Sequence, residues 1–305
     1  MIAYGRTTMN EPKKKRASAV YFIRGRFWLL YLLSAALGFA LFYVLPFLAS
    51  GYYIFFEPDG VGGVNKINGI AATLFNPAFM LALKNTFFML VLYIPAISLF
   101  SLAASYVIFN MGRKFAKTGR VLLSFAFLPY IMPAIVVVAL WFFVFDGSSV
   151  LNFVLRSLAG VGLDFENGIS ALFALMLVFL WKYAGINIVI MAAAFAFVPK
   201  ETIESARMDG CGEAKLFFSV VFPQVQKQFY FTVLLSVMGI FGLSDEIYAI
   251  WGAYPPQVLY TLHNFMTNTV LKMEYHKSIT AAVVFSVFVV LCAVVYVKME
   301  KRWNG

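Results

Sequence analysis

Residues 171–197 read ALFALMLVFLWKYAGINIVIMAAAFAF, a run in which the only charged side chain is Lys182. About 20 predominantly apolar residues are enough for a helix to cross the hydrocarbon core of a bilayer. Within lipid, a helix satisfies all of its backbone polar groups internally. The run therefore predicts a transmembrane helix, and the rest of the chain is interpreted outward from it.

The composition of the whole chain agrees with a membrane protein. Of 305 residues, 62% are hydrophobic and 12% are charged, whereas soluble domains are about half apolar and a quarter charged. This excludes a soluble enzyme. Five further apolar runs are long enough to cross a membrane, at residues 27–56, 85–109, 121–145, 229–250 and 280–297. The expected fold is an all-α integral membrane protein with six transmembrane helices.

The basic residues predict the orientation of these helices. Most of the 24 lysines and arginines lie in residues 1–26, 113–120, 200–227 and 298–302, which alternate with loops that carry few. By the positive-inside rule, a multi-pass protein of the cell membrane with both termini in the cytoplasm is expected. We interpret the net charge of +10 as a topology signal with contacts to membrane lipid, and expect no nucleic acid partner.

This orientation divides the chain into four parts. Residues 1–26 form a basic cytoplasmic tail, 27–56 the first transmembrane helix, 57–84 an extracytoplasmic loop, and 85–302 a transmembrane domain with five spans.

One cytoplasmic loop between the fourth and fifth spans is more than a simple turn. Residues 199–226 read PKETIESARMDGCGEAKLFFSVVFPQVQ. Acidic residues after Pro199 suit a helix N-terminus, and Gly210 and Gly212 suit a turn. A second helix is expected from about Glu213, ending before Pro223. The loop is therefore predicted to be a helix-turn-helix on the cytoplasmic face.

The spacing within this loop resembles the signature of the integral membrane subunits of binding-protein-dependent ABC importers. Glu204-Ser205-Ala206 is followed after three residues by Gly210, and after nine more by residues 220–223, VVFP. Residues 127–130, FLPY, and 245–248, DEIY, are similar to the carbohydrate (maltose-type) branch. The ATPase-coupling residues implied by this resemblance are Glu204, Ser205, Ala206, Asp209 and Gly210.

The resemblance implies a function and a set of partners. The chain would be a permease subunit that moves a sugar, with an oligosaccharide as the expected cargo, by ATP-driven alternating access. It would work with a second homologous permease, two cytoplasmic ATPase subunits and an extracytoplasmic solute-binding protein. The sequence lacks a Gly-x-x-x-x-Gly-Lys-Ser/Thr loop, so a separate subunit is expected to bind ATP. We expect no cofactor, metal site or catalytic residue in this chain, which is therefore not expected to be an enzyme.

Polar residues within the spans are candidates for the translocation path. By residue count, Lys182 lies at a height similar to that of Asp245 and Glu246. Lys182 can pair with either acid or contact the substrate, and both alternatives remain open. The positions that the resemblance implies for the substrate path are Tyr130, Ala134, Phe179, Lys182, Tyr183, Ile186, Gly239, Ile240 and Leu243, with Asp245 beside them.

Two other functions are alternatives. A cation in the middle of a span suits an anionic saccharide or glycerol phosphate as cargo, and Lys182 is such a cation. An ATP-independent secondary transporter is a further alternative, although it would leave the cytoplasmic motif unexplained.

Overall fold

The computed structural model describes residues 29–55, 57–58, 64–65, 68–165 and 168–304. The predicted basic tail, residues 1–26, lies outside the described residues. The chain forms two compact units, Met1–Ile67 and Asn68–Gly305, which are described separately.

The described part of the first unit consists of one long helix and a short hairpin. The helix covers Leu29–Tyr52 and is long and apolar enough to cross a membrane, as predicted. Within it, a π-helical turn at Ala40–Val44 precedes α2, Leu45–Phe55, whose second residue is Pro46. Proline has no backbone N–H to donate, and a π turn is a common local adjustment in such helices. In the hairpin, β1 (Glu57–Pro58) pairs antiparallel with β2 (Val64–Asn65).

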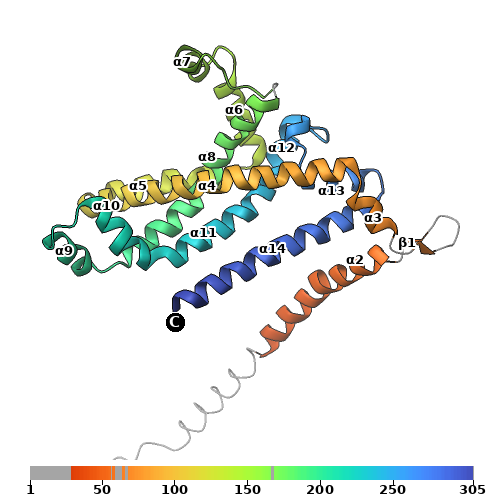
Figure 1. The fold of residues 1–305 in the computed structure, drawn as a ribbon, viewed down its shortest axis with the longest axis horizontal. Helices are drawn as coiled ribbons and strands as arrows, with labels where there is room; N and C mark the ends of the chain where they lie inside the picture. The colour runs from red at the N-terminus through yellow and green to blue at the C-terminus, as the bar shows by residue number, and fades with distance from the viewer. Residues whose placement is uncertain (1–28, 56, 59–63, 66–67, 166–167, 305) are drawn as a thin grey trace, which may run out of the picture. The chain divides into compact units, whose positions relative to one another are not determined.

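The second unit contains the remaining candidate spans, which pack side by side (Figure 1). After the short helix α3, Asn68–Leu74, the long helix α4 contacts α8 over much of its length and also contacts α11. The long helices are α4 (Pro77–Lys114), α8 (Gly168–Ala196), α11 (Phe222–Gly242) with its continuation α12 (Ser244–Trp251), and α14 (Tyr275–Asn304). These elements confirm the predicted all-helical membrane fold.

Helix α4 is longer than a bilayer requires. It has 38 residues, or about 57 Å at 1.5 Å per residue. Its N-cap is Asn76, whose side chain accepts a hydrogen bond from the amide of Ala78 at 2.9 Å. The helix therefore begins within the range 57–84 that was expected to be a loop.

The third expected span, residues 121–145, is not one straight helix. Helix α5 (Ala116–Phe127) and the 3₁₀ turn η2 (Leu128–Ile131) are followed by α6 (Ala134–Phe145) after a bend of 106°. Met132 is extended, with ψ of 135°, because the residue before a proline disfavours the helical region. Pro133 therefore breaks the helix, and the described residues contain six candidate spans only when this bent pair is counted as one.

The predicted helix-turn-helix is present, but the end predicted for its second helix was wrong. Helix α9 covers Lys200–Met208 and α10 covers Glu213–Leu216. The chain then continues through a π turn, η3 (Phe217–Val221), directly into α11. In this turn the amide of Phe222 donates to the carbonyl of Phe217. The turn carries the helix past Pro223, so that this proline does not end it.

Two further helices lie outside the predicted spans. Helix α7, Val150–Ala159, follows the bent third span, and α13, Leu262–Leu271, follows the 3₁₀ turn η4, Gln257–Leu259. The side chain of Asn85 donates to the carbonyl of Tyr260 at 3.1 Å, and Thr86 accepts from the amide of Leu262 at 2.9 Å. These bonds fix the start of α13 against α4.

The core of the second unit lies where α8 crosses α4, α5 and α11. A Cβ atom at Gly185 would lie 2.1 Å from the carbonyl oxygen of Ala126. Only glycine allows the backbones of α5 and α8 to approach this closely, which is a common device between membrane helices. This contact positions η2 and its Tyr130 beside α8.

Candidate functional site

The helix-turn-helix at one end of the second unit is closed by a defined hydrogen-bond pattern. The amide of Cys211 donates to the carbonyl of Ala206, and the amide of Gly210 donates to that of Arg207, each at 3.1 Å. These are the two bonds of a Schellman motif. Gly210 occupies the left-handed position with φ of 77°, which glycine adopts without steric cost. The sequence therefore correctly predicted a turn at this glycine.

One face of this turn is anchored in the helical core. Ala206 is buried together with Ile203 and Leu216, in a cluster that includes Phe195 from α8. An exposed ion pair between Arg207 and Glu213, at 2.8 Å, also joins α9 to α10. A unit held in this way can transmit a displacement to α8 and α11 as a rigid body.

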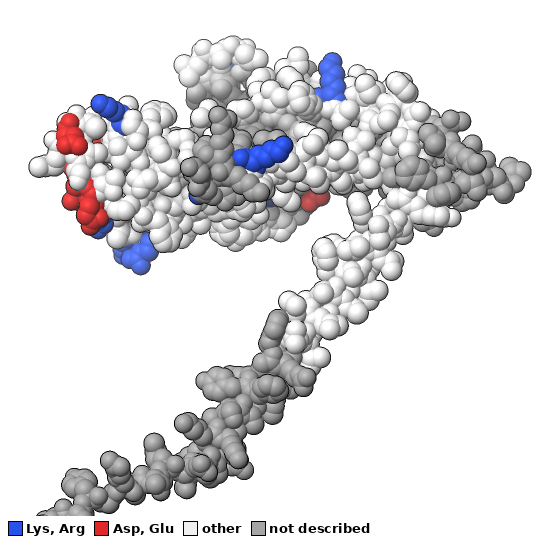
Figure 2. Space-filling model, turned by 60° about the horizontal axis from the view of Figure 1, so that its bottom comes forward, with Lys and Arg blue, Asp and Glu red and all other residues white. Residues whose placement is uncertain are grey.

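The opposite face of α9 carries charge and one large apolar side chain. Glu204, Ser205 and Asp209 are exposed, whereas Ala206 points into the core. Figure 2 shows charged side chains gathered at this end of the unit, while most of the visible surface is uncharged. Met208 is 89% exposed at the end of α9.

A cavity of about 280 Å³, here called the inner cavity, lies between η2, α8 and α11. Four residues predicted for the substrate path line it together: Tyr130, Tyr183, Ile186 and Gly239. The rings of Tyr130 and Tyr183 lie edge to face, with centroids 6.2 Å apart and an interplanar angle of 79°. The structure therefore brings together the aromatic residues that were expected to contact a sugar.

Two glycines of α11 make room for one of these rings. A Cβ atom at Gly239 would lie 3.1 Å from Cδ1 of Tyr183, and one at Gly242 would lie 2.6 Å from its hydroxyl oxygen. The ring of Tyr183 therefore lies against a part of α11 that lacks side chains. Gly242 lines the inner cavity but was not predicted.

Sequence reasoning also missed a polar pair in the inner cavity. The side-chain amide of Asn187 donates to the hydroxyl of Ser236 at 2.7 Å, and this hydroxyl donates to the carbonyl of Thr232 at 2.8 Å. Within the described part of the chain, the buried Oδ1 atom of Asn187 has no hydrogen-bond donor. An asparagine in an apolar span was a signal for this site, because buried polar groups in membranes are expensive and often functional.

Lys182 lies beside the inner cavity but is paired. Its ammonium group donates to Oε1 of Glu246, and the two side chains are 10% and 0% exposed. The nitrogen of Lys182 also lies 5.4 Å from the centre of the Tyr183 ring, within the range of a cation–π interaction. Of the two acids considered from the sequence, the structure places Glu246 at this cation.

The other predicted path residues lie elsewhere. Phe179 and Leu243 are fully buried and Ile240 is 5% exposed, all within the core. Helical spacing placed Phe179 on the face of Tyr183, but its ring also packs against Tyr93 of α4, with centroids 5.5 Å apart. Ala134 and Asp245 line a second cavity of about 390 Å³, here called the outer cavity.

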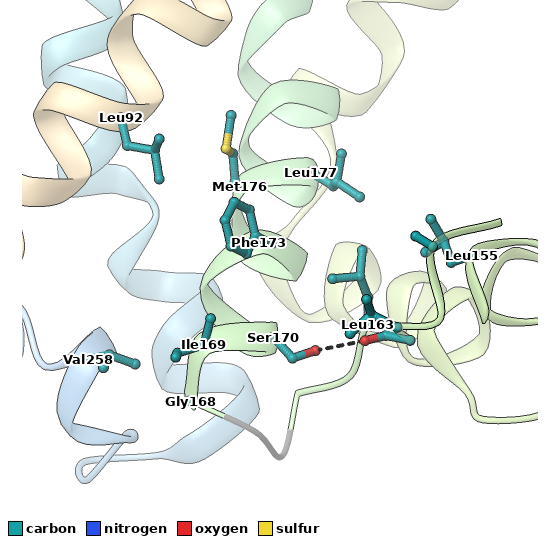
Figure 3. Close-up of a pocket in the computed structure, with 13 residues that line it drawn as sticks. Leu92, Leu155, Leu163, Gly168, Ile169, Ser170, Phe173, Met176, Leu177 and Val258 are labelled. Atoms are coloured by element: carbon teal, nitrogen blue, oxygen red, sulfur yellow. Dashed lines mark hydrogen bonds between the residues drawn. The ribbon is translucent and has the colours of Figure 1, made fainter.

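A cavity of about 900 Å³ between α4, α7 and α8 lacks the chemistry of a polar ligand site. Figure 3 shows that apolar side chains, including Leu92, Phe173 and Met176, surround it. The hydroxyl of Ser170 is directed to the carbonyl of Gly162 at 3.4 Å. Among the described residues, no three His, Cys, Asp or Glu side chains lie together as a group that could hold a metal ion.

The fold and these cavities define a class of protein. A bundle of membrane-spanning helices encloses aromatic and polar cavities and carries a rigid two-helix projection at one end, as in a transport permease. Residues 99–305 match the family model described as binding-protein-dependent transport system inner membrane component. The chain belongs to this family, and it is therefore a membrane protein and a transport permease component.

Individual relatives are similar over most of their length. The chain is 25% identical to the sn-glycerol-3-phosphate transport system permease protein UgpA of Yersinia pestis bv. Antiqua, covering 86% of this chain and 90% of the relative. It is 26% identical to the arabinooligosaccharides transport system permease protein AraP of Bacillus subtilis, covering 88% and 87%.

A solved structure has the same fold. It is a chain of a bacterial alginate ABC transporter in complex with an alginate pentasaccharide-bound periplasmic protein, with a TM-score of 0.71 and 18% sequence identity. The match covers 91% of this chain and 96% of that chain.

Proposed function

We propose that this chain is the membrane permease subunit of an ATP-driven importer for a neutral sugar, with an oligosaccharide as its cargo. The observation that carries the proposal is the inner cavity, where Tyr130 and Tyr183 offer rings and the buried Oδ1 atom of Asn187, which has no hydrogen-bond donor among the described residues, is free to accept one from a ligand. Aromatic faces and amide oxygens match the apolar faces and hydroxyl groups of a sugar. The arabinooligosaccharide permease among the relatives supports this cargo class.

The charge of the inner cavity favours neutral cargo over anionic cargo. The cation that motivated an anionic saccharide or glycerol phosphate, Lys182, is compensated by Glu246. A paired cation attracts an anion less, because the two charges cancel at short range. The relatives named for glycerol phosphate and alginate keep the anionic alternative as the competing proposal.

In this proposal, the chain performs no chemistry itself. Separate cytoplasmic ATPase subunits bind and hydrolyse ATP, and one of them receives the exposed face of α9 with Glu204 and Asp209. A second homologous permease completes the pathway, and an extracytoplasmic binding protein delivers the sugar. Closure of the ATPase pair moves the helix-turn-helix, and α8 and α11 carry this motion to the inner cavity.

Uptake measurements test the cargo. Tyr130→Ala should lower uptake of the neutral sugar about tenfold, because a lost ring contact and its hydroxyl are worth about 1.4 kcal/mol. The matched control is Phe125→Ala, which removes a ring of the same span that is 68% exposed outside the cavity. Labelled arabino-oligosaccharides, maltotriose, glycerol 3-phosphate and an alginate trisaccharide are offered to cells that produce the complete transporter. Preferred uptake of either anionic compound would contradict neutral cargo.

We also propose that both termini and the α9–α10 end lie in the cytoplasm. This orientation rests on the distribution of lysine and arginine. It places α9 where a cytoplasmic ATPase can reach it.

Cysteine labelling tests the orientation. In a background in which Cys211 and Cys292 are replaced by serine, Phe115→Cys and Leu158→Cys place single thiols at positions that are 64% and 83% exposed. A membrane-impermeant maleimide added to intact cells should label position 158 and leave position 115 unlabelled until the cells are opened. The reverse pattern would show the opposite orientation.

A further inference from the structure

The outer cavity is lined by a buried polar atom that accepts no hydrogen bond within the described structure. Asn268 of α13 is 4% exposed and lines this cavity. Its Nδ2 atom donates to the carbonyl of Ala253 at 2.8 Å, whereas its Oδ1 atom has no hydrogen-bond donor among the residues that the structure describes. A buried acceptor without a donor costs free energy, so a ligand with a donor group would be stabilised there.

The other walls of the outer cavity supply complementary chemistry. Asp245 contributes an exposed carboxylate, which accepts up to four hydrogen bonds. Tyr248, one turn later on α12, is 53% exposed and offers a ring face. Thr267 and His263 line the side formed by α13. Burial lowers the pKa of His263, and the carboxylate of Asp245 opposes this shift. A neutral imidazole both donates and accepts, as sugar hydroxyls require.

The two cavities follow one another along one helical stretch. Gly239 lines the inner cavity and Asp245 the outer one, and six residues of helix separate them by about 9 Å along the axis. In Figure 1, α12 and α13 lie farther than α11 from the α9–α10 end. A sugar that comes from the side opposite the ATPases therefore meets the outer cavity first.

We propose that the outer cavity is a second saccharide subsite, which binds one sugar ring through Asp245, Asn268 and the face of Tyr248 while the inner cavity holds another. This inference rests on the proposed sugar function. A volume of about 390 Å³ is within the range of small-molecule sites. Two successive ring sites select a cargo of at least two sugar units, because a single ring cannot occupy both.

A size ladder of saccharides tests the second subsite. Partial hydrolysates of arabinan and of starch, containing neutral saccharides of one to four units, are offered to cells that produce the complete transporter. The imported members are identified by mass spectrometry. The intact transporter should favour two or more units. Asp245→Ala and Tyr248→Ala should each lower uptake of these saccharides at least tenfold, with a raised KM, and Tyr248→Phe should lose less than Tyr248→Ala.

Controls separate loss of the subsite from loss of the fold and from failure of the sugar function. Tyr254→Ala removes an aromatic side chain, 70% exposed and outside the outer cavity, and should leave uptake within twofold. The amount of assembled complex is measured for every variant, and uptake is expressed per complex. Unchanged uptake in both alanine variants would overturn the second subsite alone, whereas preference for single units would overturn the second subsite together with the proposed oligosaccharide cargo. If the intact transporter imports no neutral saccharide, both the subsite and the proposed sugar function are overturned.

Discussion

Replacing Lys182 by methionine should strongly destabilise the protein, because the carboxylate of Glu246 would remain buried without its cation. Removing one partner of a buried ion pair costs about 3–5 kcal/mol of folding free energy. Glu246→Gln should have a similar effect, since it leaves the ammonium group of Lys182 uncompensated. We expect the yield of folded protein in mild detergent, measured by size-exclusion chromatography, to fall at least tenfold for each single variant.

The double variant Lys182→Met with Glu246→Gln should recover most of this yield. Uncharged replacements of a buried ion pair are often neutral or stabilising. The matched control is Lys182→Met with Asp245→Asn, which should give no recovery because the carboxylate of Asp245 is exposed in the outer cavity. Recovery with Asp245→Asn instead would identify Asp245 as the partner of Lys182. A stable Lys182→Met protein that has lost transport would be evidence against a structural pair and for a substrate contact.

Gly210→Val should uncouple the permease from its ATPase. The cost arises in the backbone, because φ at Gly210 is 77°, a region that β-branched residues rarely adopt. No atom beyond the adjacent residues would lie within 4 Å of the added Cβ, so a clash with another part of the protein does not contribute. The Schellman bonds that hold the turn would be lost, and the exposed face of α9 would be displaced. We expect at least a tenfold loss of sugar uptake and of ATPase that copurifies with the permease.

A neighbouring glycine provides the matched control for this turn. Gly212 is also exposed with no atom near an added Cβ, but its φ of −66° suits any residue. Gly212→Val should therefore insert, assemble and transport close to normally. Gly210→Asn, which tolerates the left-handed region, should retain more function than Gly210→Val. Full uptake with Gly210→Val would refute the proposed role of the turn.

The amino-acid sequence alone was sufficient to predict the class of fold and the family. Long apolar runs predict helices in lipid, because a span of about 20 residues must satisfy its backbone internally whatever its neighbours are. The turn at Gly210 is likewise local, since a left-handed residue at a helix end favours glycine by its own sterics. Both features depend on residues that are close in the chain.

The break in the third span could not be placed from the apolar pattern, although its cause is local. The run 121–145 has the length and composition of a span, and proline is tolerated in many such helices. Whether Pro133 bends a helix slightly or turns it by 106° depends on the packing of α6 against α12. The contact between Asn187 and Ser236 could not be predicted either, because neither residue indicates its partner in the sequence.

Only the tertiary structure decided which acid pairs with Lys182. Asp245 and Glu246 are adjacent, and counting residues gives them nearly the same height in the membrane. Neighbouring residues on a helix differ in direction by about 100°, so one acid faces the core and the other faces the outer cavity. Which acid faces the core depends on the rotation of α12 about its axis. That rotation is determined by packing between helices that are distant in the chain, since Lys182 and Glu246 are 64 positions apart. Hydrophobic runs specify which segments of the chain form membrane helices, whereas the direction of each polar side chain follows from the assembled bundle.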